Sequence, residues 1–121
     1  MSGPRIELVK WGLAPGSMIQ GRVLWDRREL QPEMVEVRLF WHTAGAGGKD
    51  QGAPIQEQFP VGAGLGELAF SMMAPNGPYS FSGKLLSIVW TIEVVVATQS
   101  VREMLVIGPG GREVVVGHEA S

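Results

Sequence analysis

The chain contains no cysteine, which excludes disulfide bonds, thiolate nucleophiles and thiolate metal sites. This absence suits a reducing compartment, so we expect a cytoplasmic protein. Charge is also scarce, because Asp, Glu, Lys and Arg make up 18% of the residues, whereas soluble domains average roughly 25%. The formal net charge of -2 gives no basic excess to neutralise phosphates, and this argues against a nucleic-acid partner.

Long apolar runs are absent as well. Thr91 and Glu93 interrupt the longest candidate, which falls short of the roughly 20 residues that a membrane-crossing helix needs. The N-terminal segment carries Arg5, Glu7 and Lys10, so it lacks the apolar centre of a secretory signal. We therefore expect neither a membrane span nor a secretory signal.

Metal ligands are few and scattered. His42 and His118 are the only histidines, and Asp26 and Asp50 the only aspartates, whereas a metal site needs at least a third ligand close by. The glutamates are spread over positions that are mostly outward-facing: Glu7, Glu36, Glu67, Glu93, Glu103 and Glu113. We expect both histidines to be ordinary surface residues, and we predict no metal and no cofactor.

Catalytic motifs are incomplete. Ser80 or Ser82 could form a triad with His42 and Asp50, but no nucleophile elbow supports this reading. The glycine-rich run at 45–50 resembles a phosphate-binding loop superficially, yet Thr43 stands where its first glycine belongs and Asp50 where Ser or Thr should follow the lysine. We therefore predict no catalytic residues and no enzyme activity.

Seventeen glycines and eight prolines punctuate the chain at short intervals, and the segments between them are rich in Val, Ile, Leu, Trp and Phe. This rhythm predicts an all-β fold of about seven to eight strands in two packed antiparallel sheets. At 121 residues the chain fits one domain, residues 1–121. The candidate strands are 5–11, 18–26, 34–43, 55–59, 67–73, 84–97, 101–107 and 112–117.

Alternating apolar residues identify the buried faces. The core-facing sets are Leu86, Ile88, Trp90, Ile92, Val94 and Val96; Val35, Val37, Leu39 and Trp41; Ile19, Gly21, Val23 and Trp25; and Gly66, Leu68, Phe70 and Met72. We expect Gly21 to make room for a bulky neighbour. Since three of the four tryptophans fall in these sets, Trp11 is the one plausible exposed ring, and with it a carbohydrate-binding platform remains an alternative.

Two surface features could serve a partner. Phe40, Met73, Val89 and Val115 fall on otherwise polar faces and could together form an exposed apolar patch. The segment 101–116 could instead be an edge that accepts a partner strand. The glycine-rich connections at 44–53 and 62–66 are expected to be mobile loops.

Several short motifs together resemble the arrestin family over residues 11–107. They are Leu13-Ala14-Pro15-Gly16 before a strand with Gly21 and Val23, Leu68-Ala69-Phe70 before Pro75, the loop Gly77-Pro78-Tyr79-Ser80-Phe81-Ser82-Gly83-Lys84, and the strand with Ile88, Trp90, Ile92 and Val94. The resemblance implies an immunoglobulin-like antiparallel β-sandwich of arrestin type.

The same resemblance implies a noncatalytic protein-interaction or scaffolding module of prokaryotic style, with an unidentified protein partner and self-association as a further possibility. Arrestins and their relatives among the sporulation-control and retromer proteins carry two such sandwiches in tandem, whereas this chain has length for one. The family's interdomain switch, its phosphate-binding lysines and its C-terminal tail find no matching positions here. A small-ligand or carbohydrate-binding module is the alternative function.

Overall fold

The computed structural model describes residues 3–45, 52, 55–62, 66–83 and 86–115. Within these ranges it contains ten strands and one short 3-10 turn. The elements are β1 (Arg5–Leu8), β2 (Gly12–Leu13), β3 (Met18–Leu24), β4 (Met34–Gly45), β5 (Ile55–Pro60), β6 (Glu67–Met73), β7 (Phe81–Ser82), β8 (Leu86–Val96), β9 (Gln99–Ile107), η1 (Pro109–Gly111) and β10 (Val114–Val115). The all-β prediction is confirmed.

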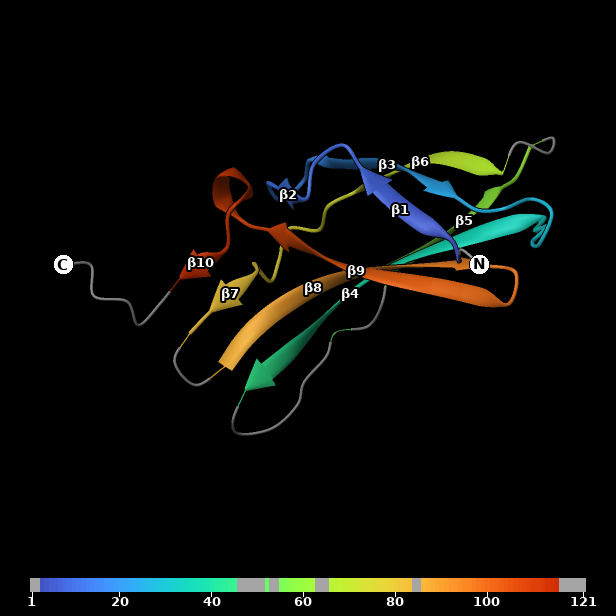
Figure 1. Ribbon diagram of the computed structural model, residues 1–121. Helices are drawn as coiled ribbons and strands as arrows, with labels where there is room; N and C mark the ends of the chain where they lie inside the picture. The colour runs from blue at the N-terminus through green and yellow to red at the C-terminus, as the bar shows by residue number, and fades with distance from the viewer. Residues whose placement is uncertain (1–2, 46–51, 53–54, 63–65, 84–85, 116–121) are drawn as a thin grey trace.

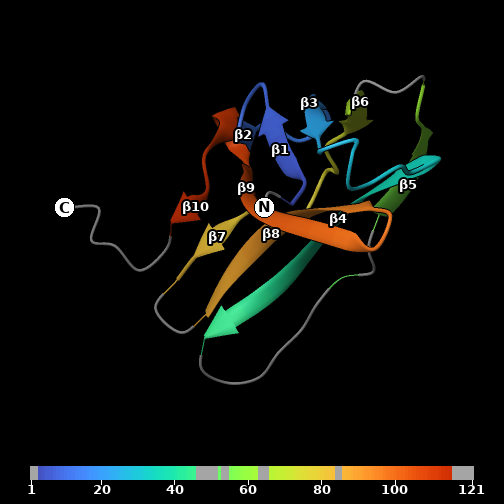
Figure 2. The same cartoon turned by 45° about the vertical axis from the view of Figure 1, so that its right-hand side comes forward.

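The strands form two sheets that pack face to face (Figure 1). The smaller sheet has three strands in the order β1-β3-β6. The larger sheet has seven strands, of which β10-β7-β8-β4-β5 form the main path, while β9 also pairs with β8, and β2 pairs with β9. Figure 2 shows β1, β3 and β6 side by side above the larger sheet, with β6 outermost. This two-layer arrangement is the predicted β-sandwich.

Most strand pairs are antiparallel, as predicted, but β2 pairs with β9 and β10 pairs with β7 in parallel. The first parallel pair arises because the chain leaves the smaller sheet after Leu8 and joins the larger sheet at Gly12 and Leu13. Just before β2, the Trp11 carbonyl accepts a hydrogen bond of 2.8 Å from the Val106 N–H. The N-terminal segment thereby links the two sheets along one side of the sandwich.

The predicted strands agree with the observed ones in place and differ at their ends. The predicted strand 67–73 coincides with β6. The predicted strand 5–11 is too long, because β1 ends at Leu8 and a bend follows before β2. Of the prediction 112–117, two residues form β10, and the last two lie outside the described residues. β2 and β7 were not predicted, since a strand of two residues is too short to show a period.

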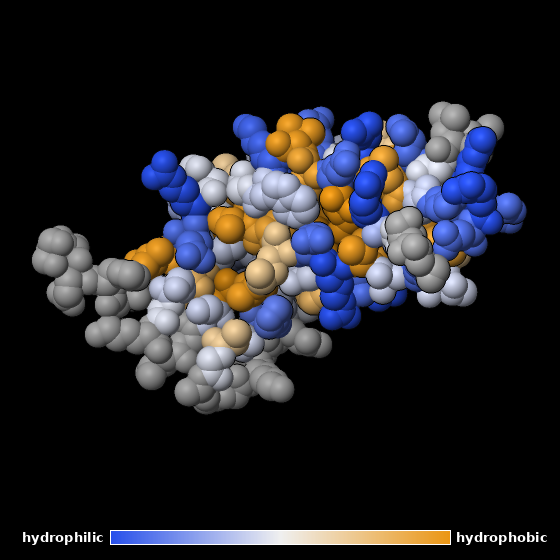
Figure 3. Space-filling view, in the orientation of Figure 1, coloured by the Kyte–Doolittle hydropathy of each residue, from blue (hydrophilic) through white to orange (hydrophobic). Residues whose placement is uncertain are grey.

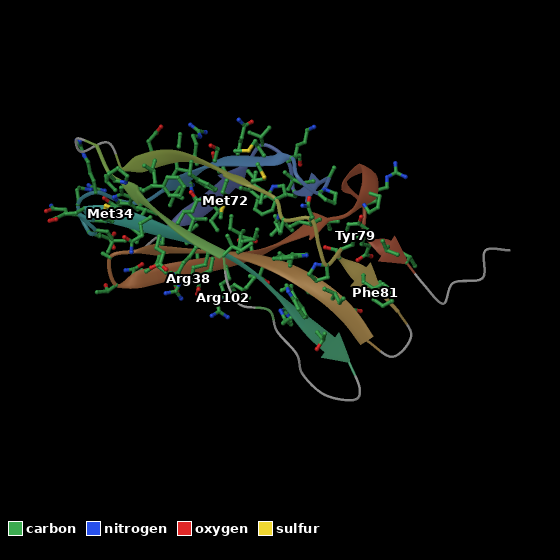
Figure 4. All side chains as sticks on the ribbon, turned by 180° about the vertical axis from the view of Figure 1, so that it is seen from behind. Met34, Arg38, Met72, Tyr79, Phe81 and Arg102 are labelled. Atoms are coloured by element: carbon green, nitrogen blue, oxygen red, sulfur yellow. The ribbon has the colours of Figure 1, made fainter. Side chains whose placement is uncertain are left out.

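The core lies between the sheets and is built from alternate residues of the paired strands. Met72 of β6 points into it from the smaller sheet (Figure 4). The predicted core faces are confirmed over most of their length, and their fully buried members are Ile19, Val23, Val35, Val37, Leu39, Ile92, Val94 and Val96. Ile88 is only partly buried and lies outside the core cluster, and the side chain of Leu86 is not described. Trp25 and Trp90 are also buried, whereas Trp41 packs against the core and stays partly exposed. Each fully buried aliphatic side chain contributes about 1.5–3 kcal/mol, so this core is the main source of stability.

Gly21 lies on the core-facing side of β3, between Leu8 of β1 and Phe70 of β6. A Cβ atom at this position would lie 2.5 Å from the Glu7 carbonyl oxygen and 2.7 Å from Leu8 Cδ2. The prediction that this glycine makes room for a bulky neighbour is confirmed, and the neighbour is Leu8.

Candidate functional site

Strands β4, β8 and β9 lie side by side in the larger sheet and share an outer face, on the side away from the core. Because side chains alternate along a strand, the residues between the core positions point to this face. The strand register sets Arg38, Glu93 and Arg102 opposite one another. We call these three residues the charged row.

The charged row buries a carboxylate beneath two guanidinium groups. The Glu93 side chain is 8% exposed, whereas those of Arg38 and Arg102 are 40% and 65% exposed. Arg102 Nε donates to Glu93 Oε2 at 2.8 Å, and Arg38 Nη1 donates to Glu93 Oε1 at 3.4 Å. Figure 4 shows both arginines projecting from the outer face. Glu93 does point outward, as predicted, but its neighbours cover it, and they supply the opposite charge that a buried carboxylate requires.

The next row along the same strands is Phe40, Thr91 and Met104. Thr91 is 6% exposed, whereas Met104 is 70% exposed, so a small buried residue separates two large apolar ones. The result is a shallow depression of about 360 Å³, which we call the outer-face depression. It is lined by Phe40, His42, Thr91, Arg102, Glu103 and Met104.

Arg102 connects the charged row to the outer-face depression. Its guanidinium carbon lies 5.5 Å from the centroid of the Phe40 ring, a cation–π geometry that holds the ring against the sheet. Hydrogen bonding and Coulombic attraction to Glu36 raise the pKa of the neighbouring Arg38 above its usual value, and Glu93 adds a smaller effect. Arg38 therefore stays charged, and the hydrogen bonds of Arg38 and Arg102 to Glu93 tie one wall of the depression to its floor.

The structure places His42 on the rim of the outer-face depression, partly buried on β4. His118 and Asp50 lie outside the described residues, as do residues 46–50 of the glycine-rich run. Asp26 follows β3 and accepts hydrogen bonds from the Arg28 side chain at 3.2 Å, which lower the pKa of its carboxyl group. Within the ranges that the structure describes, no three His, Asp or Glu side chains lie together in a way that could hold a metal ion.

The two serines of the hypothetical triad do not lie in the outer-face depression. Ser80 is 3% exposed, and its Oγ accepts a hydrogen bond of 3.0 Å from the Ile107 backbone N–H. Two residues earlier, the Pro78 carbonyl accepts a bond of 2.6 Å from the buried Trp90 indole N–H. Ser82 lies in β7 and pairs with Ser87 of β8, outside the part of β8 that borders the depression. Ser80 therefore fastens the loop before β7 to the core.

The predicted apolar patch does not form as one surface. Phe40 and Val89 do share the outer face of the larger sheet, since Val89 pairs with His42 two residues along from Phe40. Met73 lies in β6 of the other sheet, opposite Met18, and Val115 lies in β10 at the end of the larger sheet. The prediction of a single patch is wrong because alternation assigns a residue to a face of its own strand, not to a particular sheet.

The predicted edge at 101–116 is correct for β10, which ends the strand order of the larger sheet. β9 pairs with β2 at one end, through Val106 and Ile107, and its other end begins at Gln99, next to Gly3. Figure 3 looks onto this side and shows apolar surface between β1 and β9. Trp11, as predicted, is the most exposed tryptophan of the described chain at 41%.

The sequence does not predict the outer-face depression as a site, although it predicts that Phe40 is an exposed apolar residue. Its other essential members are Thr91, Met104 and Arg102, which a single-strand pattern treats as ordinary outward residues. The available signal was the outward spacing of apolar or aromatic residues on three strands, but only the register between strands brings them into one row.

Comparison with solved structures establishes the fold. Spo0M, a sporulation control protein from Bacillus subtilis, matches 90% of this chain with a TM-score of 0.54 and 12% sequence identity. The chain spans about half of that protein, 51% of its length. No protein-family profile and no curated protein matches the sequence. The arrestin-like β-sandwich predicted from the sequence is thus confirmed as a fold. Among the described residues there is no helix with the length and apolar character to cross a membrane.

Proposed function

We propose that residues 1–121 form a noncatalytic interaction domain, acting in the cytoplasm, that binds a partner protein through the outer-face depression. The observation that carries this proposal is the exposure of Met104, 70%, beside Phe40 and above a buried floor. An exposed apolar side chain at the edge of a depression gains the most when a partner covers it.

The lining of the depression supports a protein as its ligand. Phenylalanine, methionine and arginine are enriched in protein interfaces, and Phe40, Met104 and Arg102 provide one of each. Methionine adapts its shape to a partner because its side chain is unbranched and flexible. The depression lies open on the face of a sheet, whereas pockets for small molecules usually enclose most of the ligand. These features favour a side chain of a partner protein over a free small molecule.

The chemistry of the same lining supports a noncatalytic role. Thr91 has the hydroxyl group of a potential nucleophile, and His42 has the imidazole of a potential general base. A catalytic pair of this kind needs a third group to orient the histidine. Glu93 is engaged by two arginines, and Glu103 pairs with Ile92 on the core-facing side of β9. Glu93 is therefore already bonded to two arginines and is not available to orient His42 towards Thr91.

The alternative of a carbohydrate-binding module depends on an aromatic platform. Trp11 is 41% exposed, but Trp25 and Trp90 are buried in the core and Trp41 packs against it. One exposed ring without a second at its side is a weak platform for a sugar, since stacking sites are built from open aromatic faces. We therefore favour protein recognition.

Affinity capture with a matched pair of variants tests the proposal. Met104→Glu places a charge at the rim of the depression, and Met18→Glu places one on the outer face of the other sheet, where Met18 is 46% exposed. Each tagged protein is incubated with lysate of the source cells, and the retained proteins are quantified by mass spectrometry against the tag alone. We expect a partner that the wild type and Met18→Glu retain equally and that Met104→Glu loses at least tenfold.

Two outcomes of this experiment would contradict the proposal. A partner retained equally by Met104→Glu would locate recognition elsewhere on the domain, and the depression would lose its role. Retention of no protein by the wild type would contradict the interaction function itself.

A further inference from the structure

The free edge of the smaller sheet is formed by β6. In the part of the chain that the structure describes, no strand pairs with β6 on the side away from β3. The Ala74 N–H donates to the Ser17 carbonyl at 2.7 Å, and the Gly66 carbonyl accepts from the Trp25 N–H at 2.9 Å, so the even-numbered residues of this strand bond to β3. The backbone groups of the odd-numbered residues, Glu67, Ala69, Ser71 and Met73, therefore point away from the sheet.

The side chains of β6 leave this edge unprotected. Leu68, Phe70 and Met72 face the core and carry no charge, and the register with β3 runs through residues 67–73 without a bulge. On the outer face, Ala69 and Ser71 are small and exposed, so they leave the backbone accessible. A long, regular, apolar edge of this kind readily pairs with another strand.

Other long edges of the sandwich are protected. β5 carries Glu57 opposite the core residue Val37 and ends in Pro60, which has no N–H to donate. β9 carries Glu103 opposite the core residue Ile92 and pairs with β2 at its end, through Val106 and Ile107. Inward-pointing charges and prolines are common means of preventing strand addition. The lack of such a device on β6 distinguishes it from both.

We propose that β6 pairs with β6 of a second copy of this chain, antiparallel and about a twofold axis, to form one continuous sheet of six strands. With Phe70 opposite Phe70 of the second copy, Ala69 lies opposite Ser71 and Glu67 opposite Met73. The pairs of odd-numbered residues, Ala69 with Ser71 and Glu67 with Met73, then exchange the backbone hydrogen bonds that point outward in a single copy.

The edge is self-complementary in both charge and size. The two Glu67 side chains lie at opposite ends of the seam, so the pairing opposes no like charges. The small Ala69 and Ser71 side chains lie where the outer faces meet, beside a shallow groove of about 660 Å³ that extends to Phe59. On the core side, Leu68 lies opposite Met72, and Phe59, whose ring centroid is 6.0 Å from that of Phe70, adds apolar surface to the seam. The edge is therefore complementary to a second copy of itself in charge and in side-chain size.

The expected dimer is weak and depends on concentration. Pairing along one seven-residue strand buries a small area, and interfaces below about 1,200 Å² are typical of transient pairs. Sedimentation velocity from about 1 μM to about 1 mM covers the corresponding range of dissociation constants. We expect the mass of the wild type to rise from 13.0 kDa towards twice that value.

Paired charge variants test the register. Ala69→Lys with Ser71→Lys brings lysines face to face across the seam, and Ala69→Glu with Ser71→Glu does the same with glutamates. We expect each double variant alone to dimerise at least tenfold more weakly than the wild type, and a mixture of the two to form heterodimers. Gln56→Lys with Gln58→Lys is the control, because it adds the same charge to the exposed β5 edge and leaves the wild-type association unchanged.

Amide exchange provides a readout that needs no variant. Among the residues that the structure describes, no strand pairs with the N–H groups of Ala69 and Ser71, so we expect their exchange to slow as the protein concentration rises. A wild type that stays at 13.0 kDa throughout the range overturns the proposal. It is equally overturned if the lysine variant dimerises as the wild type does, or if the mixture forms no heterodimer. The Met104→Glu variant dimerises normally if the two proposals are independent, so failure here leaves partner binding at the depression untouched.

Discussion

Glu93 organises the outer face of the larger sheet. Its carboxylate accepts bonds from Arg102 at 2.8 Å and Arg38 at 3.4 Å while remaining 8% exposed. Through Arg102 the same network holds Phe40, whose ring lies 5.5 Å from the guanidinium carbon. A single buried acid therefore fixes both a basic wall and an aromatic wall of the depression.

Glu93→Gln should destabilise the domain. The amide keeps the shape of the carboxylate but loses its charge, so two arginines lose charge-assisted hydrogen bonds in a covered site. We expect the free energy of unfolding to fall by about 1–2 kcal/mol in urea denaturation. Glu7→Gln is the control, because Glu7 pairs with Arg22 at 2.8 Å with both side chains about half exposed, and its loss should change stability by less than about 0.5 kcal/mol. Equal effects of the two changes would contradict a special role for Glu93.

The sequence predicts the direction in which Glu93 points but not its burial. Period-two alternation depends on the strand itself, whereas burial depends on Arg38 and Arg102, which are distant in sequence and meet Glu93 only through the strand register. The same reason explains why Phe40 and Met73 were assigned to one patch although they lie on different sheets.

At the scale of single elements, the strands of the smaller sheet pack closely because β3 carries a glycine at its centre. Gly21 lies between Leu8 and Phe70, and the space that its own side chain would occupy is filled by Leu8 Cδ2 and the Glu7 carbonyl. The close approach joins β1 to β3 just before the chain crosses to the larger sheet.

Gly21→Ala should weaken this junction. The added methyl group would lie 2.5 Å from a backbone oxygen that cannot move without breaking the β1–β3 pairing. Overpacking of this kind costs about 1–3 kcal/mol, measured as a loss in the free energy of unfolding. Gly62→Ala is the control: a Cβ there has no atom within 4 Å, so stability should change by less than about 0.5 kcal/mol. A Gly21→Ala variant as stable as the wild type would show that β1 can shift freely.

Elements with a clear period were predictable and short ones were not. β3, β4, β6 and β8 were found because each alternates over seven or more residues. β2 and β7 have two residues each and form only where a longer strand offers a free edge, so tertiary contacts create them. The parallel pairing of β2 with β9 likewise depends on the path of the chain between sheets, which no local pattern records.

On the scale of the whole molecule, the two proposed surfaces are separate. The outer-face depression belongs to the larger sheet, and the open β6 edge belongs to the smaller one. A twofold axis perpendicular to the joined sheet keeps both larger sheets on the same side. The proposed dimer would therefore present two depressions in one direction, and a partner with two matching segments would bind more tightly than a partner with one.

The most direct measurement of the central claim is photo-crosslinking in the source cells. Met104→p-benzoylphenylalanine places a photoreactive ring at the rim of the depression, and Met18→p-benzoylphenylalanine places the same ring on the opposite face of the sandwich. We predict a crosslinked partner protein at position 104 and none of that partner at position 18. Crosslinking of the same partner at position 18 alone, or of no protein at position 104, would contradict recognition through the outer-face depression.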